Sequence, residues 1–346
     1  MRLRCGCFIV PPSVLDRFKK DKSLSDETRK AFANTAELEE VWRRLRAAHN
    51  IATSERKKAA LSRGVLTGLP AVTVYDCKHT QVEPGTPVPN PGASSDPSAK
   101  NAFNEATGVA KFYQQCFGRD SVDGKGMTLV SSVHYGVKYN NAFWNGQQMT
   151  YGDGDGQIFI DFTGSNDVIG HELTHGVTQF TAGLTYTNEP GALNESISDV
   201  FGSIYRQWSG NQTVAQADWL IGSGIMGPTA KQKGYTCLRD MVNPAAKHCL
   251  SQQPVDYKHY VKGGDPHVNS GIPNRAFALA ANAIGGHSWE KAGKVWYGAL
   301  TSSKATKTMK FKSFATLTVA QAKSLFASDP SVEAAVTKAW KTVLVL

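Results

Sequence analysis

The chain has 346 residues, of which 41% are hydrophobic, 10% aromatic and 19% charged. This composition is that of an ordinary globular protein and excludes a disordered or fibrous one. No apolar run approaches the roughly 20 residues that a membrane-spanning helix needs, so we expect no membrane partner. The length leaves room for two domains, or for one large domain with an accessory segment.

The net charge of +9 lies mostly at the start of the chain. Residues 1–63 contain 15 basic and 8 acidic residues, which leaves 23 basic and 21 acidic residues for the rest. A nucleic-acid interface would concentrate basic residues in the functional part of a protein. We therefore expect no nucleic-acid partner. Salt-sensitive binding of nucleic acid by the basic N-terminal segment is the alternative.

The first twelve residues contain basic side chains and only a very short apolar stretch, which Pro11 and Pro12 interrupt. A signal peptide needs a longer apolar core. We therefore expect no classical signal peptide, synthesis in the cytoplasm, and any release or secretion by a non-classical route. The six cysteines are expected to be reduced thiols. In an oxidising compartment two pairs are the candidates for disulfides: Cys77 with Cys116, and Cys237 with Cys249.

Residues 1–63 are predicted to form a propeptide-like segment. The chain starts extended at Pro11-Pro12 and continues into a short helix, and residues 24–48 place apolar side chains along one stripe of an amphipathic helix. Residues 50–63 are polar and basic, and 54–58 have the character of an exposed linker that proteases can reach. The segment is therefore expected to be detachable.

Short β-branched and aromatic runs after Gly64 predict strands, and helical periodicity dominates from Asp167 onward. The expected strands are 71–75, 127–135, 140–146 at a sheet edge, and 158–160, with a loop at 83–98 and a tight connection at 151–156. The expected helices are 102–117, one beginning at 167, 192–208, 274–283, 288–300, 319–327 and 331–345. This order predicts an α+β fold with a β-rich lobe at 64–165, a central helix at 166–182 and an α-helical lobe at 183–346.

The central helix carries the pattern His-Glu-x-x-His at His171, Glu172 and His175. Residues four apart share one face of a helix, so the two imidazoles can meet at a single point. Two neutral imidazoles so placed suit zinc, and Glu172 can reach a water in the open position of the ion. Such a pattern also arises by chance on polar helix faces. The zinc interpretation therefore requires a third ligand elsewhere in the chain.

Glu195, in the stretch 191–199, is the best candidate for that ligand, because a catalytic zinc commonly takes three protein ligands and one water. Asp199 lies four residues later on the same helical face and can accept a hydrogen bond from one ligand imidazole. Asn194 can orient the other imidazole. A solvated acidic face is the alternative for a lone helix of this kind, but its position shortly after the motif favours ligation.

With these residues in place, the chain resembles the thermolysin family of metallopeptidases over roughly residues 70–346. The short N-terminal segment with Pro11-Pro12-Ser13-Val14-Leu15 is most similar to the protealysin-like branch. Five separated motifs follow the order of the family: Asn141–Trp144, His171–His175, Asn194–Glu195 with Asp199, Leu238–Arg239, and His267–Gly271. The resemblance implies a two-lobed fold around a zinc-binding helix, and a zinc endopeptidase made as a self-processing precursor.

The resemblance also implies roles for single residues. One catalytic zinc would be held by His171, His175 and Glu195, with Asp199 and Asn194 as partners of the ligands and Glu172 as general base. The oxyanion would be stabilised by Tyr186 and His267, the latter oriented by Asp265. The substrate would be bound by Arg239 at the carbonyl beyond the scissile bond, and by the strand that contains Asn141, Ala142 and Trp144.

A large hydrophobic residue just after the cut bond is the substrate preference that the resemblance implies. The apolar pocket for it would be formed by or lie next to Phe159, Phe162, Val168, Ile221 and Leu238. Ordinary core packing is the alternative for each of these side chains. A metzincin is a poorer match, because that class needs Gly and His where this chain has Thr178 and Thr181.

The multi-carboxylate calcium site of the family would use Asp167 and Asp218. The other acidic positions of that site are Arg206, Leu220 and Ser223 in this chain. Calcium prefers six to eight oxygen ligands. We therefore expect calcium at this position to be bound weakly or not at all.

The N-terminal segment is expected to cover the cleft as an inhibitory propeptide, with Pro11-Pro12 held near the zinc. A helix that docks on the surface without any effect is the alternative. A further hypothesis gives Cys5 or Cys7 the open zinc position, since thiolates are good zinc ligands. The expected partners are a peptide or protein substrate and this segment, in a monomer; a catalytically silent zinc or peptide-binding protein is the competing function.

Overall fold

The computed structural model describes residues 7–52 and 68–346, without the side chains of residues 45–52. A six-stranded sheet has the strand order β1-β5-β6-β4-β2-β3, with β2–β4 and β4–β6 parallel and the other pairs antiparallel. Its strands are β1 (Cys7–Phe8), β2 (Val72–Asp76), β3 (Thr86–Pro87), β4 (Leu129–Val133), β5 (Ala142–Trp144) and β6 (Met149–Tyr151). The edge strand expected at 140–146 is thus covered by a strand from the N-terminal segment.

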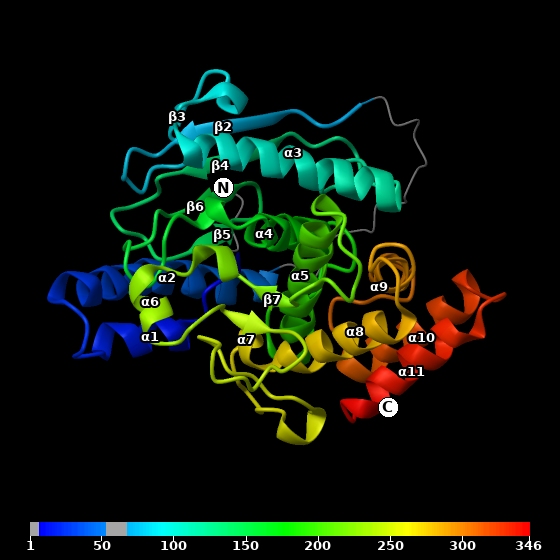
Figure 1. The fold of residues 1–346 in the computed structure, drawn as a ribbon. Coiled ribbons are helices and arrows are strands. Elements are labelled where there is room, and N and C mark those ends of the chain that lie inside the picture. The colour runs from blue at the N-terminus through cyan, green and yellow to red at the C-terminus, as the bar shows by residue number, and fades with distance from the viewer. Residues whose placement is uncertain (1–6, 53–67) are drawn as a thin grey trace.

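The helices divide between the sheet and a separate helical region (Figure 1). Near the sheet and in the centre lie α3 (Pro97–Phe117), α4 (Asn166–Gln179), α5 (Asn188–Ser209) and the short α6 (Pro228–Gln232). The helical region consists of α7 (Pro266–Asn269), α8 (Gly271–Ile284), α9 (Ala292–Thr301), α10 (Phe311–Leu325) and α11 (Pro330–Thr342). A small sheet joins β7 (Leu220–Ile221) to β8 (Arg239–Asp240). The predicted α+β architecture, with a mixed sheet, a central motif helix and a helical region, is confirmed.

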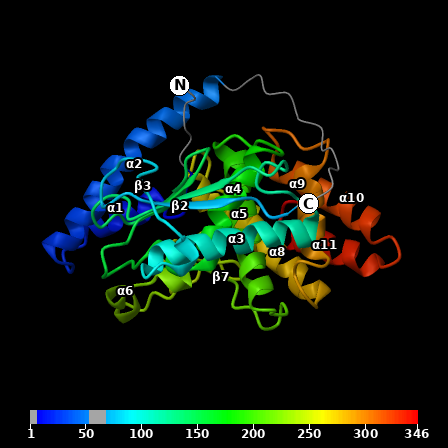
Figure 2. The ribbon, with the colours of Figure 1, turned by 90° about the horizontal axis from the view of Figure 1, so that it is seen from above.

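The N-terminal segment folds into two helices, α1 (Pro12–Lys20) and α2 (Asp26–Ala52), which lie on the opposite side of the molecule from α10 and α11 (Figure 2). Pro12 opens α1, where the missing N–H costs no helical hydrogen bond. Phe18 and Phe32 bury their rings against each other, and Phe32 also contacts Phe159 at a centroid distance of 6.0 Å. The segment therefore shares the main hydrophobic core.

The motif helix α4 packs unusually closely on α5, and two glycines permit it. A Cβ on Gly202 would lie 2.5 Å from the Asp167 carbonyl oxygen, and a Cβ on Gly170 would lie 3.0 Å from the Gly202 Cα. Side chains at these positions would force the helices apart. This close approach brings Glu195 on α5 next to His171 on α4.

Several sequence-based boundaries are wrong. The expected strand at 158–160 forms only an isolated bridge between Phe159 and Met226. The Asp155 carboxylate accepts hydrogen bonds from the backbone N–H groups of Ile158 and Phe159, both at 3.0 Å, so these donors are not free for a neighbouring strand. Strand β6 was not predicted, α3 begins at Pro97, and α10 begins at Phe311 rather than at 319.

The cysteines with described positions form no disulfide, so neither candidate pair is bridged. Cys77 donates to the Pro84 carbonyl at 3.6 Å, while Cys237 and Cys249 lie with their sulfur atoms 3.5 Å apart. The linker expected at 54–58 and Cys5 fall outside the described residues. Within residues 7–52 and 68–346, no helix is both long and apolar enough to cross a membrane.

Candidate metal centre and active site

Three potential ligand side chains converge where α4 meets α5. The Nε2 atoms of His171 and His175 lie 3.0 Å apart. Glu195 places its two carboxylate oxygens 3.5 Å from His171 Nε2 and 3.6 Å from His175 Nε2. All three side chains are buried. The helical spacing of the motif and the close packing of α5 thus produce the predicted set of one carboxylate and two imidazoles.

The outer nitrogens of both imidazoles are already bonded. His171 Nδ1 lies 2.8 Å from Asp199 Oδ1, and His175 Nδ1 lies 2.8 Å from Asn194 Oδ1. Because each acceptor oxygen receives a hydrogen bond from an Nδ1–H group, the two Nε2 atoms carry lone pairs that face each other across 3.0 Å. Only a bound cation or a shared proton can remove the repulsion between these lone pairs. Asp199 and Asn194 therefore lie where partners of zinc ligands are expected.

The charges around the cluster also fit a cation. Burial lowers the pKa of His171, but hydrogen bonds to Asp199 and Glu195 outweigh it and raise the pKa to about 9. Burial raises the pKa of Glu195, but the charges of His267 and His175 hold it well below its usual value. Glu195 Oε2 has no hydrogen-bond partner among the described residues. Two nitrogens, one carboxylate and a demand for positive charge fit zinc.

Glu172 lies beside the cluster, with its side chain fully buried. Its Oε2 accepts a hydrogen bond from the Trp144 backbone N–H at 2.8 Å, which fixes the carboxyl group against β5. Its Oε1 has no hydrogen-bond partner in the described part of the chain. Burial raises the pKa of Glu172 well above its ordinary value. This oxygen is therefore available to a water molecule or a substrate group.

Tyr186 and His267 stand together on the other side of the cluster. The Tyr186 hydroxyl donates to Glu195 Oε1 and lies 3.4 Å from His267 Nε2. His267 Nδ1 lies 2.6 Å from Asp265 Oδ1, which holds the imidazole with its Nε2 toward the cluster. Asp265 also caps α7 by accepting the His267 backbone N–H. The sequence-predicted pair of hydrogen-bond donors and its orienting carboxylate are therefore brought together.

Arg239 and Asp199 form a fully buried ion pair. The guanidinium donates from Nε and Nη2 to the two Asp199 oxygens at 2.8 and 2.7 Å. Asn274, at 2.8 Å from Asp199 Oδ2, completes the environment of that carboxylate. Asn274 was not predicted as part of the site. In the sequence it is marked only by its position shortly after the His267 motif, and buried asparagines are common.

The N-terminal segment occupies this site through its backbone. β1 pairs antiparallel with β5, and the Ile9 N–H donates to the Ala142 carbonyl at 3.2 Å. The Phe8 carbonyl lies 2.5 Å from His267 Nε2, and the Ile9 carbonyl accepts from Arg239 at 2.9 Å. The peptide bond between Phe8 and Ile9 therefore lies between His267, predicted to stabilise the oxyanion, and Arg239, predicted to bind the substrate carbonyl.

Asn141 fastens the same segment. Its side chain accepts the Val10 N–H at 2.9 Å and donates to the Val10 carbonyl at 3.1 Å, in the two-way pattern of a peptide-binding amide. It also donates to Glu39 of α2 at 2.5 Å, and Glu39 pairs with Arg43 at 2.6 Å. Glu39 was not predicted as part of the site, because nothing in a helical stripe identifies a charged residue that becomes buried against another segment.

The residues expected to form an apolar pocket lie in the core. Each is fully buried in the same hydrophobic cluster as Ile9: Phe159, Phe162, Val168, Ile221 and Leu238. Phe159 and Phe162 also contact each other at a ring distance of 5.4 Å. Cys7 lies in β1 and is not among the three residues that could hold the metal.

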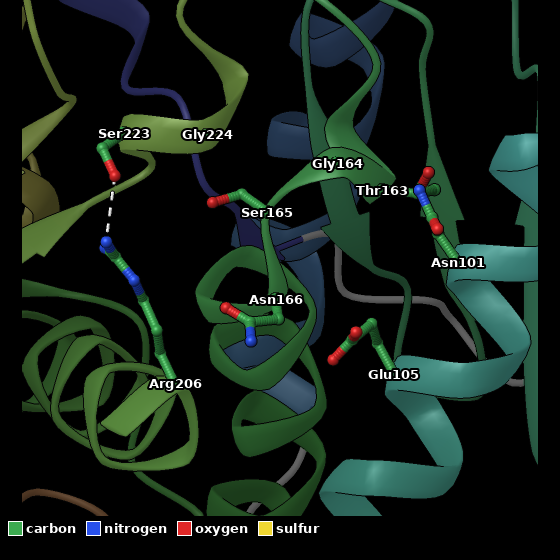
Figure 3. A pocket seen from close by; sticks show the side chains of 9 residues that line it. All are labelled: Asn101, Glu105, Thr163, Gly164, Ser165, Asn166, Arg206, Ser223 and Gly224. Carbon is green, nitrogen blue, oxygen red and sulfur yellow. Dashed lines mark hydrogen bonds between the residues drawn. The ribbon is translucent and has the colours of Figure 1, made fainter. Parts of the chain in front are cut away.

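The position expected for calcium holds a guanidinium group. Arg206 donates to Asp218 at 2.6 Å, to the Leu220 carbonyl at 3.1 Å and to Ser223 at 3.2 Å, and lies 3.9 Å from Asp167. Arg206 and Ser223 line a polar cavity of about 340 Å³ (Figure 3). The cation at this position is therefore supplied by the chain itself.

The fold and the buried His-His-Glu cluster define a zinc-dependent metalloendopeptidase. Comparison with known proteins agrees: residues 24–179 match the family description "Thermolysin metallopeptidase, catalytic domain", and residues 182–345 match "Thermolysin metallopeptidase, alpha-helical domain". The chain belongs to the thermolysin family of metallopeptidases.

Individual relatives match from 78% to 99% of the chain. An extracellular metalloprotease of Pectobacterium carotovorum subsp. carotovorum is 38% identical over 99% of this chain and 97% of its own. Protease PrtS of Photorhabdus sp. strain Az29 is 42% identical over 78% of this chain and 75% of its own. The solved structure of the protealysin precursor, a metalloproteinase from Serratia proteamaculans, has a TM-score of 0.84 at 38% identity and covers 98% of this chain and 100% of its own.

Proposed function

We propose that this chain is the precursor of a secreted zinc endopeptidase whose own residues 1–63 occupy its active site. The observation that carries the proposal is the backbone of Phe8 and Ile9, whose carbonyls bind His267 and Arg239 at 2.5 and 2.9 Å. A substrate would present the same two carbonyls to the same two donors. The similarity to a protealysin precursor and to an extracellular metalloprotease supports both parts of the proposal.

The ion would be held by His171, His175 and Glu195, with the fourth position open. Zinc, when bound there, supplies a Lewis acid that makes a water more acidic and polarises a carbonyl. Asp199 and Asn194 accept hydrogen bonds from the Nδ1–H groups of the two histidines, so both Nε2 lone pairs point toward the ion. The donor set and its burial support this assignment.

The remaining steps belong to side chains of this protein. Glu172, held by the Trp144 N–H, would accept a proton from the attacking water and return it to the departing amine. The negative oxygen that develops would receive hydrogen bonds from Tyr186 and His267, and preorganised donors in a buried site act mainly on the transition state. Asp265 keeps the His267 ring in position for that role.

Substrate binding would follow the path of the N-terminal segment. A peptide would pair antiparallel with β5 through Ala142, while Asn141 would bind its backbone two residues beyond the Phe8 position. Arg239 would hold the carbonyl after the scissile bond. Ile9 lies at that position, in the same buried apolar cluster as Leu238, so we propose a preference for a large hydrophobic residue just after the cut bond.

The proposed organisation has a propeptide at 1–63, a β-rich lobe at 64–165, the active-site helix at 166–182 and a helical lobe at 183–346, in a monomer. Self-processing would release the segment. Calcium would be bound weakly or not at all, because Arg206 pairs with the acidic groups at that position.

The substitution Glu172→Ala tests the function. We expect the wild-type chain to hydrolyse a peptide and to lose its N-terminal segment, and the variant to do neither while it retains zinc by elemental analysis. Glu290→Ala, at an exposed carboxylate, is the matched control. A wild-type chain that binds zinc but stays inert after the segment has been removed by an added protease would identify a silent binding protein instead.

A substrate series tests the specificity. Quenched peptides that differ only in the residue after the cut bond, with Ile, Leu, Ala or Asp, should differ in kcat/KM by about tenfold or more in favour of Ile and Leu. Equal values for Leu and Asp would contradict the proposed apolar pocket.

A further inference from the structure

A second group of potential metal ligands lies outside the active site, at Cys237, His248 and Cys249. One ligand atom from each of the three residues lies within 4.8 Å of the other two. The two sulfur atoms are 3.5 Å apart, and both cysteines are buried at 0% and 1% exposure. His248 is 40% exposed, so the cluster is open to solvent on the imidazole side.

The backbone holds the two thiols together. Cys237 and Cys249 form a parallel bridge, in which the Thr236 N–H donates to the His248 carbonyl at 3.0 Å and the Leu250 N–H donates to the Cys237 carbonyl at 2.9 Å. Backbone hydrogen bonds on both sides of the pair leave it little freedom to separate. The proximity of the sulfurs is thus built into the fold.

Asp240 provides a fourth group beside the cluster. Its Oδ1 accepts the backbone N–H groups of Val242 and Asn243 at 2.8 and 2.9 Å, which fixes the carboxylate. Its Oδ2 lies 3.4 Å from His248 Nε2, and the side chain is only 13% exposed. The carboxylate therefore pairs with the imidazole of the cluster.

We propose that this cluster is a second metal site, for a thiophilic divalent cation of the zinc class. Zinc–sulfur bonds of about 2.3 Å in a tetrahedron place two sulfurs roughly 3.8 Å apart, whereas a disulfide requires about 2.05 Å. The distance of 3.5 Å is close to the first value and far from the second. Each thiol releases its proton to solvent as its sulfur binds the ion, and the three ligands are Cys237, Cys249 and His248, with Asp240 paired to the imidazole.

The ion would stabilise the loop that carries Arg239. Residues 238–248 lie between the two cysteines, and β8 with Arg239 begins two residues after Cys237. Arg239 in turn holds Asp199, the partner of His171. A metal that joins both ends of this loop would therefore fix the position of Arg239 indirectly, without contacting the active site.

Zinc stoichiometry of the full chain tests the proposal. In the background Glu172→Gln, which prevents self-processing, we expect about two zinc ions per chain after equilibration with zinc and gel filtration. Adding Cys249→Ser or His248→Ala should lower this value by about one. Cys116→Ser and His259→Ala, at a cysteine and a histidine outside the cluster, should leave it unchanged. The result is the difference in zinc content between the Glu172→Gln chain with and without the added substitution. An active site that failed to bind zinc would not change this difference.

Absorption spectroscopy with cobalt(II) is a second test, for the case in which a variant folds poorly. Cobalt(II) bound to thiolates gives a sulfur-to-metal charge-transfer band, and the ligands proposed for the active site include no sulfur. The band should appear in the Glu172→Gln chain and disappear with Cys249→Ser. No difference in zinc content together with no such band would overturn the proposal. So would two thiols fewer than the six of the sequence on titration in denaturant without reductant, since that result means a disulfide.

Discussion

The Phe8 carbonyl oxygen lies 2.5 Å from Nε2 of His267, although the two residues are 259 positions apart in the chain. Arg43 of α2 stacks over the Phe8 ring at 5.0 Å, and its guanidinium lies 3.8 Å from Asp265, which orients His267. The N-terminal segment therefore engages both the proposed oxyanion donor and the group that positions it. A peptide substrate cannot reach His267 while this contact persists.

Weakening the contact between α2 and the cleft should raise the activity of the precursor. Glu39 is buried and joins Arg43 to Asn141, so Glu39→Ala removes two hydrogen bonds to a charged group, each worth about 1.5–3 kcal/mol. We expect faster peptide hydrolysis and earlier loss of the segment, followed by a quenched peptide and intact mass. Glu40→Ala is the control, because Glu40 is the next residue of the same helix and forms an exposed pair with Arg44. Equal rates for the two variants would show that Glu39 does not help to hold the segment.

Asp265→Asn should lower kcat of the processed enzyme by about 10- to 100-fold with a smaller change in KM. Asparagine keeps the size of the side chain but removes the charge that holds the His267 ring. Asp256→Asn changes a similar Asp–His pair, with the exposed His259, and serves as control. A variant with normal kcat would remove Asp265 from the proposed mechanism.

The stability of this protein should not depend on calcium at the Arg206 position. A calcium-selective chelator that leaves zinc bound is expected to leave the midpoint of thermal unfolding unchanged in the Glu172→Gln chain. Arg206→Ala should instead lower the free energy of unfolding by about 1–3 kcal/mol, because Asp167 is buried and loses its nearest cation. A clear fall in the midpoint on chelation, restored by calcium, would contradict this expectation.

Local periodicity was sufficient to predict the parts of the site that lie on helices. His171 and His175 share a face by helical spacing, and Glu195 with Asp199 repeats the same spacing on α5. The strand at 158–160 was mispredicted because its N–H groups bond to the Asp155 carboxylate, an interaction that an apolar run does not reveal.

Long-range pairing was beyond prediction for a different reason. β1 has two residues, and its pairing of Cys7 with Trp144 spans most of the N-terminal half of the chain. Nothing in so short a strand specifies its partner. The expectation that the segment covers the cleft came from the change in composition, the exposed basic linker and the family resemblance. The contacts through Phe8, Ile9 and Glu39 required the three-dimensional arrangement.

His134 should make the stability of the fold depend on pH. Its Nδ1 lies 2.8 Å from Asp153 and its Nε2 lies 3.0 Å from Asp96, and these contacts, that to Asp153 above all, raise its pKa to about 9 despite partial burial. Since the folded pKa exceeds the unfolded value, the stabilisation is complete below about pH 6.5 and is lost as pH rises through about 9.

We therefore expect His134→Asn to lower the free energy of urea unfolding by about 2–3 kcal/mol at pH 6 and by much less at pH 10. Asparagine tolerates the left-handed backbone of this position, where φ is 52°, so backbone strain should not obscure the effect. The measurement belongs in the Glu172→Gln chain, which cannot digest itself as it unfolds. His287→Asn is the control, because the acidic contact of His287 with Glu290, at 3.4 Å, lies on the protein surface. A loss of stability that is the same at pH 6 and pH 10 would mean that His134 stabilises the fold by packing rather than by its charge.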